Sequence, residues 1–302
     1  MTMDEKAKKY WEQRQEQWWK NQDKSDERLQ KRLEKYYRQS SKEIEREIAY
    51  YFAQYGKNNV IEFRELLRDL APDQKTMLFE NMDDFAREYP EYQRFLPVRE
   101  SIYKLNRLQG LHYSMQIELV KLGALEQKEF EKHLLDTYGK NYKNIMRELG
   151  LGTSFVAQSD AVMRNIIFTK WVEDKNFSDR IWTNKEKMLN YMKNEFRDSL
   201  ARGDSFSEVA NAMRNRFGVG AFDAKRLVYT ESAFVLNQSH KNGYLNAGVE
   251  RYEYSAVLDR RTSPVCKNMD GKEFTFEESQ VGVNFPPLHT FCRSTFIGIL
   301  DE

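Results

Sequence analysis

Residues 1–50 contain neither glycine nor proline, the two residue types that most readily interrupt a helix. The segment holds 13 basic and 11 acidic residues, so about half of it is charged. Its large apolar side chains recur at helical spacing, among them Trp11, Trp18, Leu29 and Leu33. The sequence therefore predicts a long charged N-terminal helix, an arm of residues 1–50 with a narrow aromatic stripe.

This aromatic stripe has two interpretations. Aromatic side chains supply much of the energy of protein interfaces, so the arm could dock on a partner protein. The same side chains could instead pack on the body of this chain. The candidate partner-binding residues are Trp11, Trp18, Trp19, Tyr36 and Tyr37.

The middle of the chain continues with apolar residues at helical spacing, and residues 51–160 are predicted to form a helical domain. One helical pattern in this domain covers about forty positions, and we expect it to break near Gly110 or Gly123. A later helical pattern is expected to be interrupted at Gly218 and Gly220.

The last 52 residues differ in kind, because they hold three of the six prolines and short alternating segments. Strands are expected at 252–258, 272–276 and 294–300, with Asp270-Gly271 as a hairpin turn. The predicted fold class is mainly α with a small C-terminal α+β module, in which the short antiparallel strands lie near residues 251–300.

The charge balance limits the classes of partner. Lys and Arg number 48 and Asp and Glu number 47, so the net charge of +1 excludes a strongly basic protein. No window reaches the roughly 18 apolar residues of a membrane span, and the N-terminus lacks the apolar region of a signal peptide. With two cysteines a disulfide framework is excluded, and we expect reduced thiols in a cytosolic setting, although a single bridge is arithmetically allowed.

The densest cluster of chemically special residues lies at 259–293. Cys266, His289 and Cys292 are ligand types that zinc accepts, and Asp259, Asp270 or water could complete the set. The alternative is a pair of buried thiols beside a hydrogen-bonded histidine.

Enzyme signatures are incomplete. The chain contains no P-loop, no G-x-S-x-G and no H-E-x-x-H sequence. The alternative function is a metal- or thiol-dependent enzyme, a hydrolase or nuclease, built on the 259–293 cluster. Its active groups would be a Cys–His dyad or the carboxylates of Asp259 and Asp270.

Several sequence blocks stand out over about residues 165–300. They are Arg226-Leu227-Val228-Tyr229-Thr230-Glu231, then Leu258-Asp259-x-Arg261-Thr262, Asp270-Gly271, and Pro286-Pro287-Leu288-His289-x-x-Cys292-Arg293. Together these blocks resemble the phage head morphogenesis family of the Mu F type. On this resemblance, residues 161–302 form a Mu F-like domain with its β-rich part at 251–302. The residues carried over as a structural motif are Arg226, Thr230, Glu231, Asp259, Arg261, Thr262, Asp270, Gly271, Pro287, His289, Cys292 and Arg293.

The resemblance implies a minor capsid protein rather than an enzyme, and no catalytic residue is carried over. It implies the portal protein, and the major capsid or scaffolding protein, as partners. It implies a place in the virion, inside the head or at the portal vertex, after assembly in the host cytoplasm, and a role in head assembly and DNA passage. Some family members have further cysteines where this chain has Ser263 and Ser294, a departure that removes two potential ligands. No cofactor is therefore predicted, and zinc is the one candidate.

Contact with packaged double-stranded DNA is expected to be weak. The basic residues Lys31, Arg32, Lys35 and Arg38 have glutamate neighbours, which favours a solvated helix face. Phosphate binding scales with the number of phosphates neutralised, so a chain with net charge +1 predicts salt-sensitive binding at most.

Overall fold

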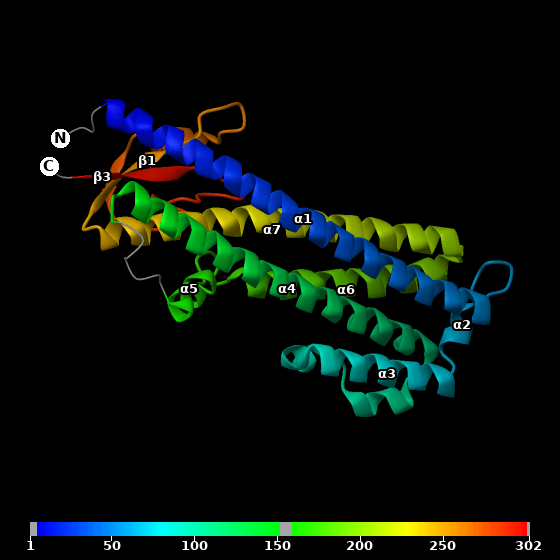
Figure 1. The fold of residues 1–302 in the computed structure, drawn as a ribbon. Helices are drawn as coiled ribbons and strands as arrows, with labels where there is room; N and C mark the ends of the chain where they lie inside the picture. The colour runs from blue at the N-terminus through cyan, green and yellow to red at the C-terminus, as the bar shows by residue number, and fades with distance from the viewer. Residues whose placement is uncertain (1–4, 152–158, 301–302) are drawn as a thin grey trace. The chain divides into compact units, whose positions relative to one another are not determined.

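The computed structural model describes residues 5–151 and 159–300, which are mainly helical with one small sheet near the C-terminus (Figure 1). This confirms the predicted fold class. The helices and 3-10 helices are α1 (Glu5–Tyr55), α2 (Phe63–Leu66), α3 (Pro72–Glu88), η1 (Pro90–Phe95), η2 (Arg99–Lys104), α4 (Arg107–Glu148), α5 (Asp160–Ile167), α6 (Phe177–Arg202), α7 (Phe206–Asn246) and α8 (Pro264–Met269). The strands are β1 (Arg251–Ser255), β2 (Glu273–Thr275) and β3 (Thr295–Ile299). No helix of the described residues is long and apolar enough to cross a membrane.

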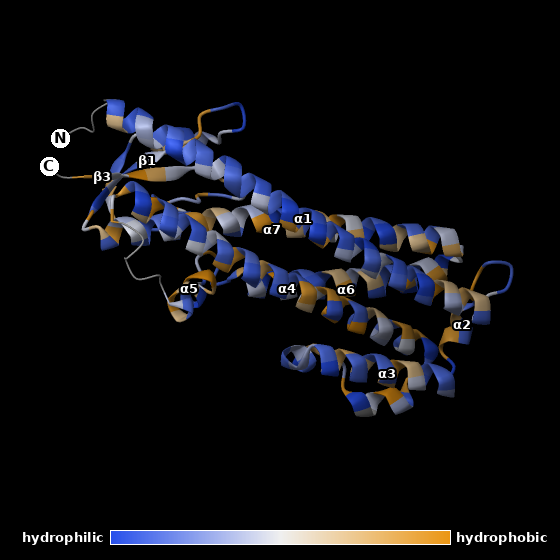
Figure 2. Cartoon of the chain, viewed as in Figure 1, coloured by the Kyte–Doolittle hydropathy of each residue, from blue (hydrophilic) through white to orange (hydrophobic). Residues whose placement is uncertain are grey.

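The segment without glycine or proline forms one uninterrupted helix, α1, as predicted. Figure 2 shows that α1 is hydrophilic along most of its length, with apolar residues confined to part of its surface. The stripe residues Leu29 and Leu33 are almost fully buried. α1 is thus amphipathic, and its stripe faces protein rather than solvent.

The breaks expected at glycines do not occur, because α4 and α7 run through all four positions. A Cβ atom added at Gly123 would lie 2.8 Å from the ring of Trp182, and one added at Gly220 would lie 2.7 Å from the ring of Tyr37. These two glycines permit close packing of a ring on the helix. That packing offsets the cost of about 1 kcal/mol that a glycine imposes on a helix.

The chain forms two compact units, and each is assembled from separated segments. As far as their residues are described, unit 1 combines Met1–Lys31, Glu129–Asp179 and Lys225–Glu302, and unit 2 combines Arg32–Lys128 and Arg180–Ala224. The divisions expected after residues 50 and 160 do not coincide with these units, because α1, α4 and α7 each contribute to both.

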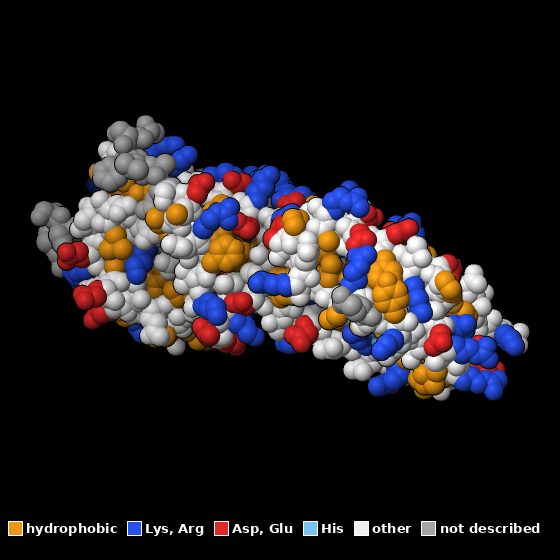
Figure 3. All heavy atoms as spheres, turned by 90° about the horizontal axis from the view of Figure 1, so that it is seen from below, with side chains coloured by type: hydrophobic (Ala, Val, Ile, Leu, Met, Phe, Trp, Pro, Cys, Tyr) orange, Lys and Arg blue, Asp and Glu red, His pale blue; other side chains and the backbone are white. Residues whose placement is uncertain are grey.

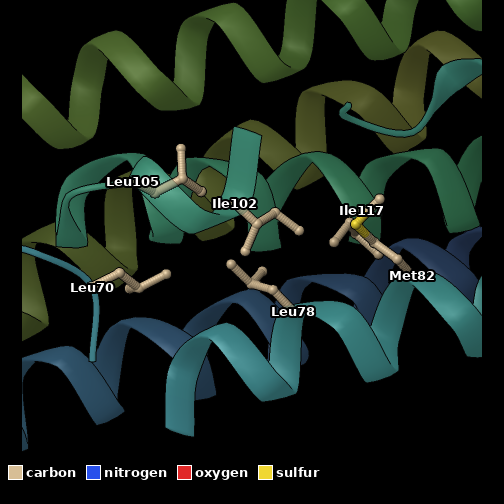
Figure 4. Packing of buried hydrophobic residues seen from close by; sticks show 6 residues of the cluster. All are labelled: Leu70, Leu78, Met82, Ile102, Leu105 and Ile117. Carbon is tan, nitrogen blue, oxygen red and sulfur yellow. The ribbon is translucent and has the colours of Figure 1, made fainter. Parts of the chain in front are cut away.

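Unit 2 is held by apolar packing of α3, η2 and α4. Figure 4 shows the side chains of one cluster pointing toward one another: Leu70, Leu78, Met82, Ile102, Leu105 and Ile117. All six are nearly or fully buried. A second cluster stacks Phe95 on Trp182, with ring centroids 3.8 Å apart.

Unit 1 contains the sheet, whose order is β2-β1-β3 with both pairs antiparallel. Tyr252 in the central strand pairs with Phe274 on one side and Gly298 on the other. Tyr252 also contacts Phe285 and Phe296, which are completely buried. The sheet therefore packs through a cluster of aromatic rings, which prefer such tilted and edge-on contacts.

The Asp270-Gly271 pair turns the chain, but not as the predicted hairpin. β1 and β2 are joined by a longer connection that includes α8, and the pair lies between α8 and β2. Gly271 has φ +76°, a conformation that favours glycine. Its amide donates to the carbonyl of Tyr254 in β1, so the turn is attached directly to the central strand.

The tryptophans of the predicted arm are packed inside unit 1. Trp11 contacts Tyr244 with ring centroids 5.9 Å apart, and Trp18 contacts His240 at 4.7 Å, both on α7. The exposed fraction of each tryptophan is at most 8%, including Trp19 against α7. This burial corrects the expectation of a stripe available to a partner and favours the alternative, packing on the chain's own body. In unit 2, Tyr37 is buried and Tyr36 is half-buried.

Candidate functional site

Cys266, His289 and Cys292 meet in unit 1. Cys266 lies on α8, and the other two lie in the segment before β3. The Cys266 Sγ is 3.2 Å from His289 Nε2 and 3.7 Å from Cys292 Sγ. One ligand atom from each of the three residues lies within 4.8 Å of the other two. The three residues that the sequence grouped as ligands therefore form one cluster, which we call the thiol–imidazole cluster.

Local hydrogen bonds fix the cysteines in place. Ser263 is the N-cap of α8, and its Oγ accepts from the amide of Cys266 at 3.2 Å, with Pro264 in the first helical turn. The amide of Cys292 donates to the carbonyl of His289 at 3.2 Å, which closes a tight turn. Both thiols have exposed fractions of 2%. The two cysteines are therefore buried and held by local hydrogen bonds, whereas His289 is half-buried.

The imidazole of His289 has a defined orientation. Its Nδ1 lies 2.8 Å from the backbone carbonyl of Thr290, which can only accept, so Nδ1 carries the hydrogen. The lone pair of Nε2 then faces Ser263 Oγ at 2.8 Å and the sulfur of Cys266. The nitrogen that points into the cluster is thus an electron-pair donor.

The two thiols share their protons unequally. Hydrogen bonding to Cys266 lowers the pKa of Cys292 to about 6, against the opposing effect of burial. The same hydrogen bond, together with burial, raises the pKa of Cys266 to about 12. The hydrogen bond between the two sulfurs therefore favours loss of the first proton from the pair and opposes loss of the second.

Asp259 lies outside the cluster and belongs to a separate ion-pair network. Its Oδ1 accepts from Arg293 Nη2 at 2.7 Å and from the amide of Arg261 at 2.7 Å. These contacts lower the pKa of Asp259 to about 2, with the Arg293 hydrogen bond as the largest cause. Thr262 Oγ1 accepts from the amide of Asp259. The carboxylate thus holds a loop together, and it is not among the grouped ligand atoms of the described residues.

The remaining motif residues of the module have structural contacts. Asp270 Oδ1 accepts from the amide of Ala256 at 2.8 Å, directly after β1. Asp270 therefore caps the strand end and is not part of the thiol–imidazole cluster. Pro287 is buried and follows Pro286 through a cis peptide bond.

The motif on α7 reaches the cluster through Thr230. Its Oγ1 donates to the carbonyl of Arg226 at 2.8 Å and accepts from the amide of Phe291 at 3.3 Å. Glu231 is buried and accepts from Trp171 Nε1 at 2.9 Å. Thr230 thus joins α7 to the segment before β3, and Asn237 adds a second contact by donating to the carbonyl of Ser294 at 3.3 Å.

A cavity of about 520 Å³ adjoins the cluster, and His289 and Cys292 form part of its wall. The opposite wall comes from α1, with Trp19, Asp23 and Lys24, and from α7, with Lys225 and Tyr229. Sequence reasoning missed this cavity, because no local pattern shows that α1 and α7 flank the loop before β3.

A second hollow of about 450 Å³ lies between α1 and α4 in unit 1. We call it the basic groove. Its charged lining residues are all cationic: Lys24, Arg28, Lys140, Lys143 and Arg147. The other lining residues include amide side chains such as Asn21 and Asn141. The helical spacing of Lys140, Lys143 and Arg147 was the only signal of this groove in the sequence.

The described residues thus define a mainly helical protein with a small turn-rich sheet module, whose site is a buried set of ligand-type side chains. Residues 190–297 match the family model described as Phage Mu protein F like protein. This match supports a phage Mu F-like head morphogenesis family and confirms the resemblance inferred from the sequence. The matched segment contains all of α7, strands β1 and β2, the start of β3 and the thiol–imidazole cluster. Neither a curated protein nor a solved structure matches the chain.

Proposed function

We propose that this protein is a minor head protein of a tailed phage that acts at the portal by binding other head proteins. The match of residues 190–297 to the Mu F-like family carries this proposal. The buried state of the cluster supports a binding role over the enzyme alternative. A thiol nucleophile must reach its substrate, whereas Cys266 and Cys292 each have an exposed fraction of 2%.

Mass spectrometry of purified phage particles tests this proposal. We expect the protein in a low, fixed number of copies in intact heads, and co-purification with the portal protein when the two are expressed together. Comparison of intact with emptied particles then reports whether the protein leaves with the DNA. Absence from assembled particles, or failure to bind the portal protein, would overturn the proposal.

Deletion of residues 1–50 does not test partner binding in this fold. Gln15 donates to the carbonyl of Phe296 in β3 at 2.6 Å, and Lys8 pairs with Glu253 in β1 at 2.5 Å. Removing the segment would therefore expose the sheet and the aromatic core of unit 1. Variants at exposed positions of α1 are the appropriate probes of docking by this helix.

Contact with packaged DNA would occur at the basic groove. Five cationic side chains and several amides line it, which is the chemistry that binds phosphates. The surface elsewhere is mixed: on the face drawn in Figure 3, Lys and Arg side chains alternate with Asp and Glu. A groove with a local positive field on a chain of net charge +1 is suited to a weak, salt-sensitive contact.

Fluorescence anisotropy with a short labelled duplex measures this contact. If three to five phosphates are neutralised, affinity should fall about 40- to 500-fold between 50 and 200 mM salt. The triple variant Lys140→Glu, Lys143→Glu and Arg147→Glu should abolish binding. Its matched control is Lys31→Glu, Lys35→Glu and Arg38→Glu, the same charge change outside the groove. Equal loss in both variants would contradict a groove-specific contact.

A further inference from the structure

We propose that Cys266, His289 and Cys292 bind one zinc ion that joins α8 to the segment before β3. The proposal goes beyond a role in binding head proteins and does not depend on it. Thiolate sulfur and imidazole nitrogen are the ligands of structural zinc sites, and such donors favour zinc over magnesium or calcium. The fold brings these three residues together, although Cys266 and Cys292 are 26 positions apart in the sequence. His289 lies between them in the sequence.

The spacing of the donor atoms fits a single tetrahedral ion. Two sulfur atoms bound to zinc at about 2.3 Å and at the tetrahedral angle lie about 3.8 Å apart. The two Sγ atoms here are 3.7 Å apart. The tetrahedral distance between sulfur and nitrogen is about 3.6 Å, and Cys266 Sγ lies 3.2 Å from His289 Nε2. Small side-chain adjustments therefore suffice to place all three donors around one ion.

The surroundings of His289 support metal binding over a simple hydrogen bond. A zinc-bound histidine usually donates its other ring N–H to a carbonyl or carboxylate, which fixes the tautomer. His289 has this arrangement, because Nδ1 lies 2.8 Å from the carbonyl of Thr290 and the Nε2 lone pair faces Ser263 Oγ and the sulfur of Cys266. Two hydroxyl or thiol groups, from Ser263 and Cys266, approach this one lone pair, which can accept fully from only one of them.

The fourth position lies at Ser263. Its Oγ is 2.8 Å from His289 Nε2, on the N-cap of the helix that carries Cys266. A water held by this hydroxyl, supplied from the adjoining cavity that His289 and Cys292 line, would complete the coordination. Because serine differs from cysteine only in the donor atom, Ser263→Cys would add a third thiolate at this corner.

The experiment uses the full chain purified under reducing conditions without a metal-affinity step. Elemental analysis should find one zinc per chain, and a chromophoric chelator should remove it with a measurable dissociation constant. Replacement by Co²⁺ should produce the visible bands of a tetrahedral ion and a thiolate charge-transfer band in the near ultraviolet.

Variants sharpen the assignment. Cys292→Ser and His289→Asn should each weaken zinc binding at least 100-fold, and Ser263→Cys should strengthen it at least tenfold. Asp259→Asn is the matched control, since Asp259 lies in the same module but pairs with Arg293, and it should retain one zinc. If the ligand variants fail to fold, Ser263→Cys and the Co²⁺ spectrum still decide the question.

Three results would overturn the proposal: no zinc bound at micromolar concentration, a Co²⁺ spectrum without thiolate bands, or equal affinity in the Ser263→Cys variant and the parent. A Cys266–Cys292 disulfide in protein purified without reductant, with no zinc uptake after reduction, would also overturn it. These measurements need no phage particle, so their failure is distinct from a failure of the proposed role in the head.

Discussion

The two units bury different kinds of polar cluster. In unit 2, the Lys185 ammonium contacts the Glu126 carboxylate at 2.5 Å and the Tyr37 hydroxyl, and Tyr37 donates to Glu126 at 2.9 Å. Opposite charges there neutralise each other. In unit 1, the thiol–imidazole cluster brings two cysteine sulfurs and one imidazole together and contains no Lys or Arg side chain. In the unit 2 cluster each charged group has an oppositely charged partner, whereas the side chains of the unit 1 cluster are of the types that bind metal ions.

The largest effect should come from breaking the cluster in unit 2. Glu126→Ala leaves the Lys185 ammonium buried without its partner and should lower the free energy of unfolding by about 3–5 kcal/mol. Urea denaturation followed by circular dichroism measures the change. The double variant Glu126→Leu with Lys185→Met removes both charges and should lose less than the single variant. A single variant as stable as the parent would show that the pair is not buried in solution.

The packing of the α1 tryptophans tests how much buried aromatic rings contribute to the stability of unit 1. Trp18→Ala removes a buried ring from beside His240 and should cost about 3 kcal/mol in the free energy of unfolding. Lys20→Ala is the control, because its pair with Glu16 is exposed and should contribute less than about 0.5 kcal/mol. If Trp18→Ala leaves stability unchanged but weakens portal binding, the arm interpretation would be restored.

The buried side chain of His240 makes the stability of unit 1 depend on pH. Burial lowers the pKa of His240 to about 3, so the unfolded chain binds the proton first as the pH falls below 6.5. The free energy of unfolding should therefore drop by about 2 kcal/mol between pH 7.5 and pH 5 from this residue alone.

Denaturation of the His240→Gln variant over the same pH range measures this contribution. Glutamine does not titrate, so the variant should lose about that much of the parent's pH dependence. His112 in unit 2 has a pKa lowered to about 4 by burial and by Lys193 and Arg197. Because pH 5 lies above the folded-state pKa of both histidines, His112→Gln should remove a similar part of the pH dependence. Identical pH profiles for the parent and His240→Gln would contradict the burial of a neutral imidazole.

Local sequence predicted the secondary structure where the signal was itself local. α1 follows from a run without helix breakers, and β1 from alternating side chains. β3 was predicted as a closing strand after the proline-containing segment. The glycines misled the same reasoning. Their effect on helix propensity is about 1 kcal/mol, and the contact of Gly123 with Trp182 outweighs it.

The candidate site was half predictable. The sequence grouped Cys266, His289 and Cys292 from their residue types and close spacing, and the structure brings these three together. The sequence also offered Asp259 and Asp270 as ligands. In the structure the carboxylate of Asp259 pairs with Arg293, and that of Asp270 accepts from the amide of Ala256. Residue type alone cannot distinguish a ligand from a loop-holding carboxylate, since both need the same oxygen atoms.

The amino-acid sequence by itself determined the helical character, the small C-terminal sheet module and the Mu F-like pattern, because each depends on neighbouring residues. Only the tertiary structure decided that the tryptophan stripe of α1 packs on α7 and that Ser263 Oγ lies 2.8 Å from His289 Nε2, beside the two cysteines. It also decided that segments far apart in the chain share one unit. The physical reason is that these contacts join residues tens to hundreds of positions apart, and side-chain packing, which no local pattern encodes, selects among the alternatives.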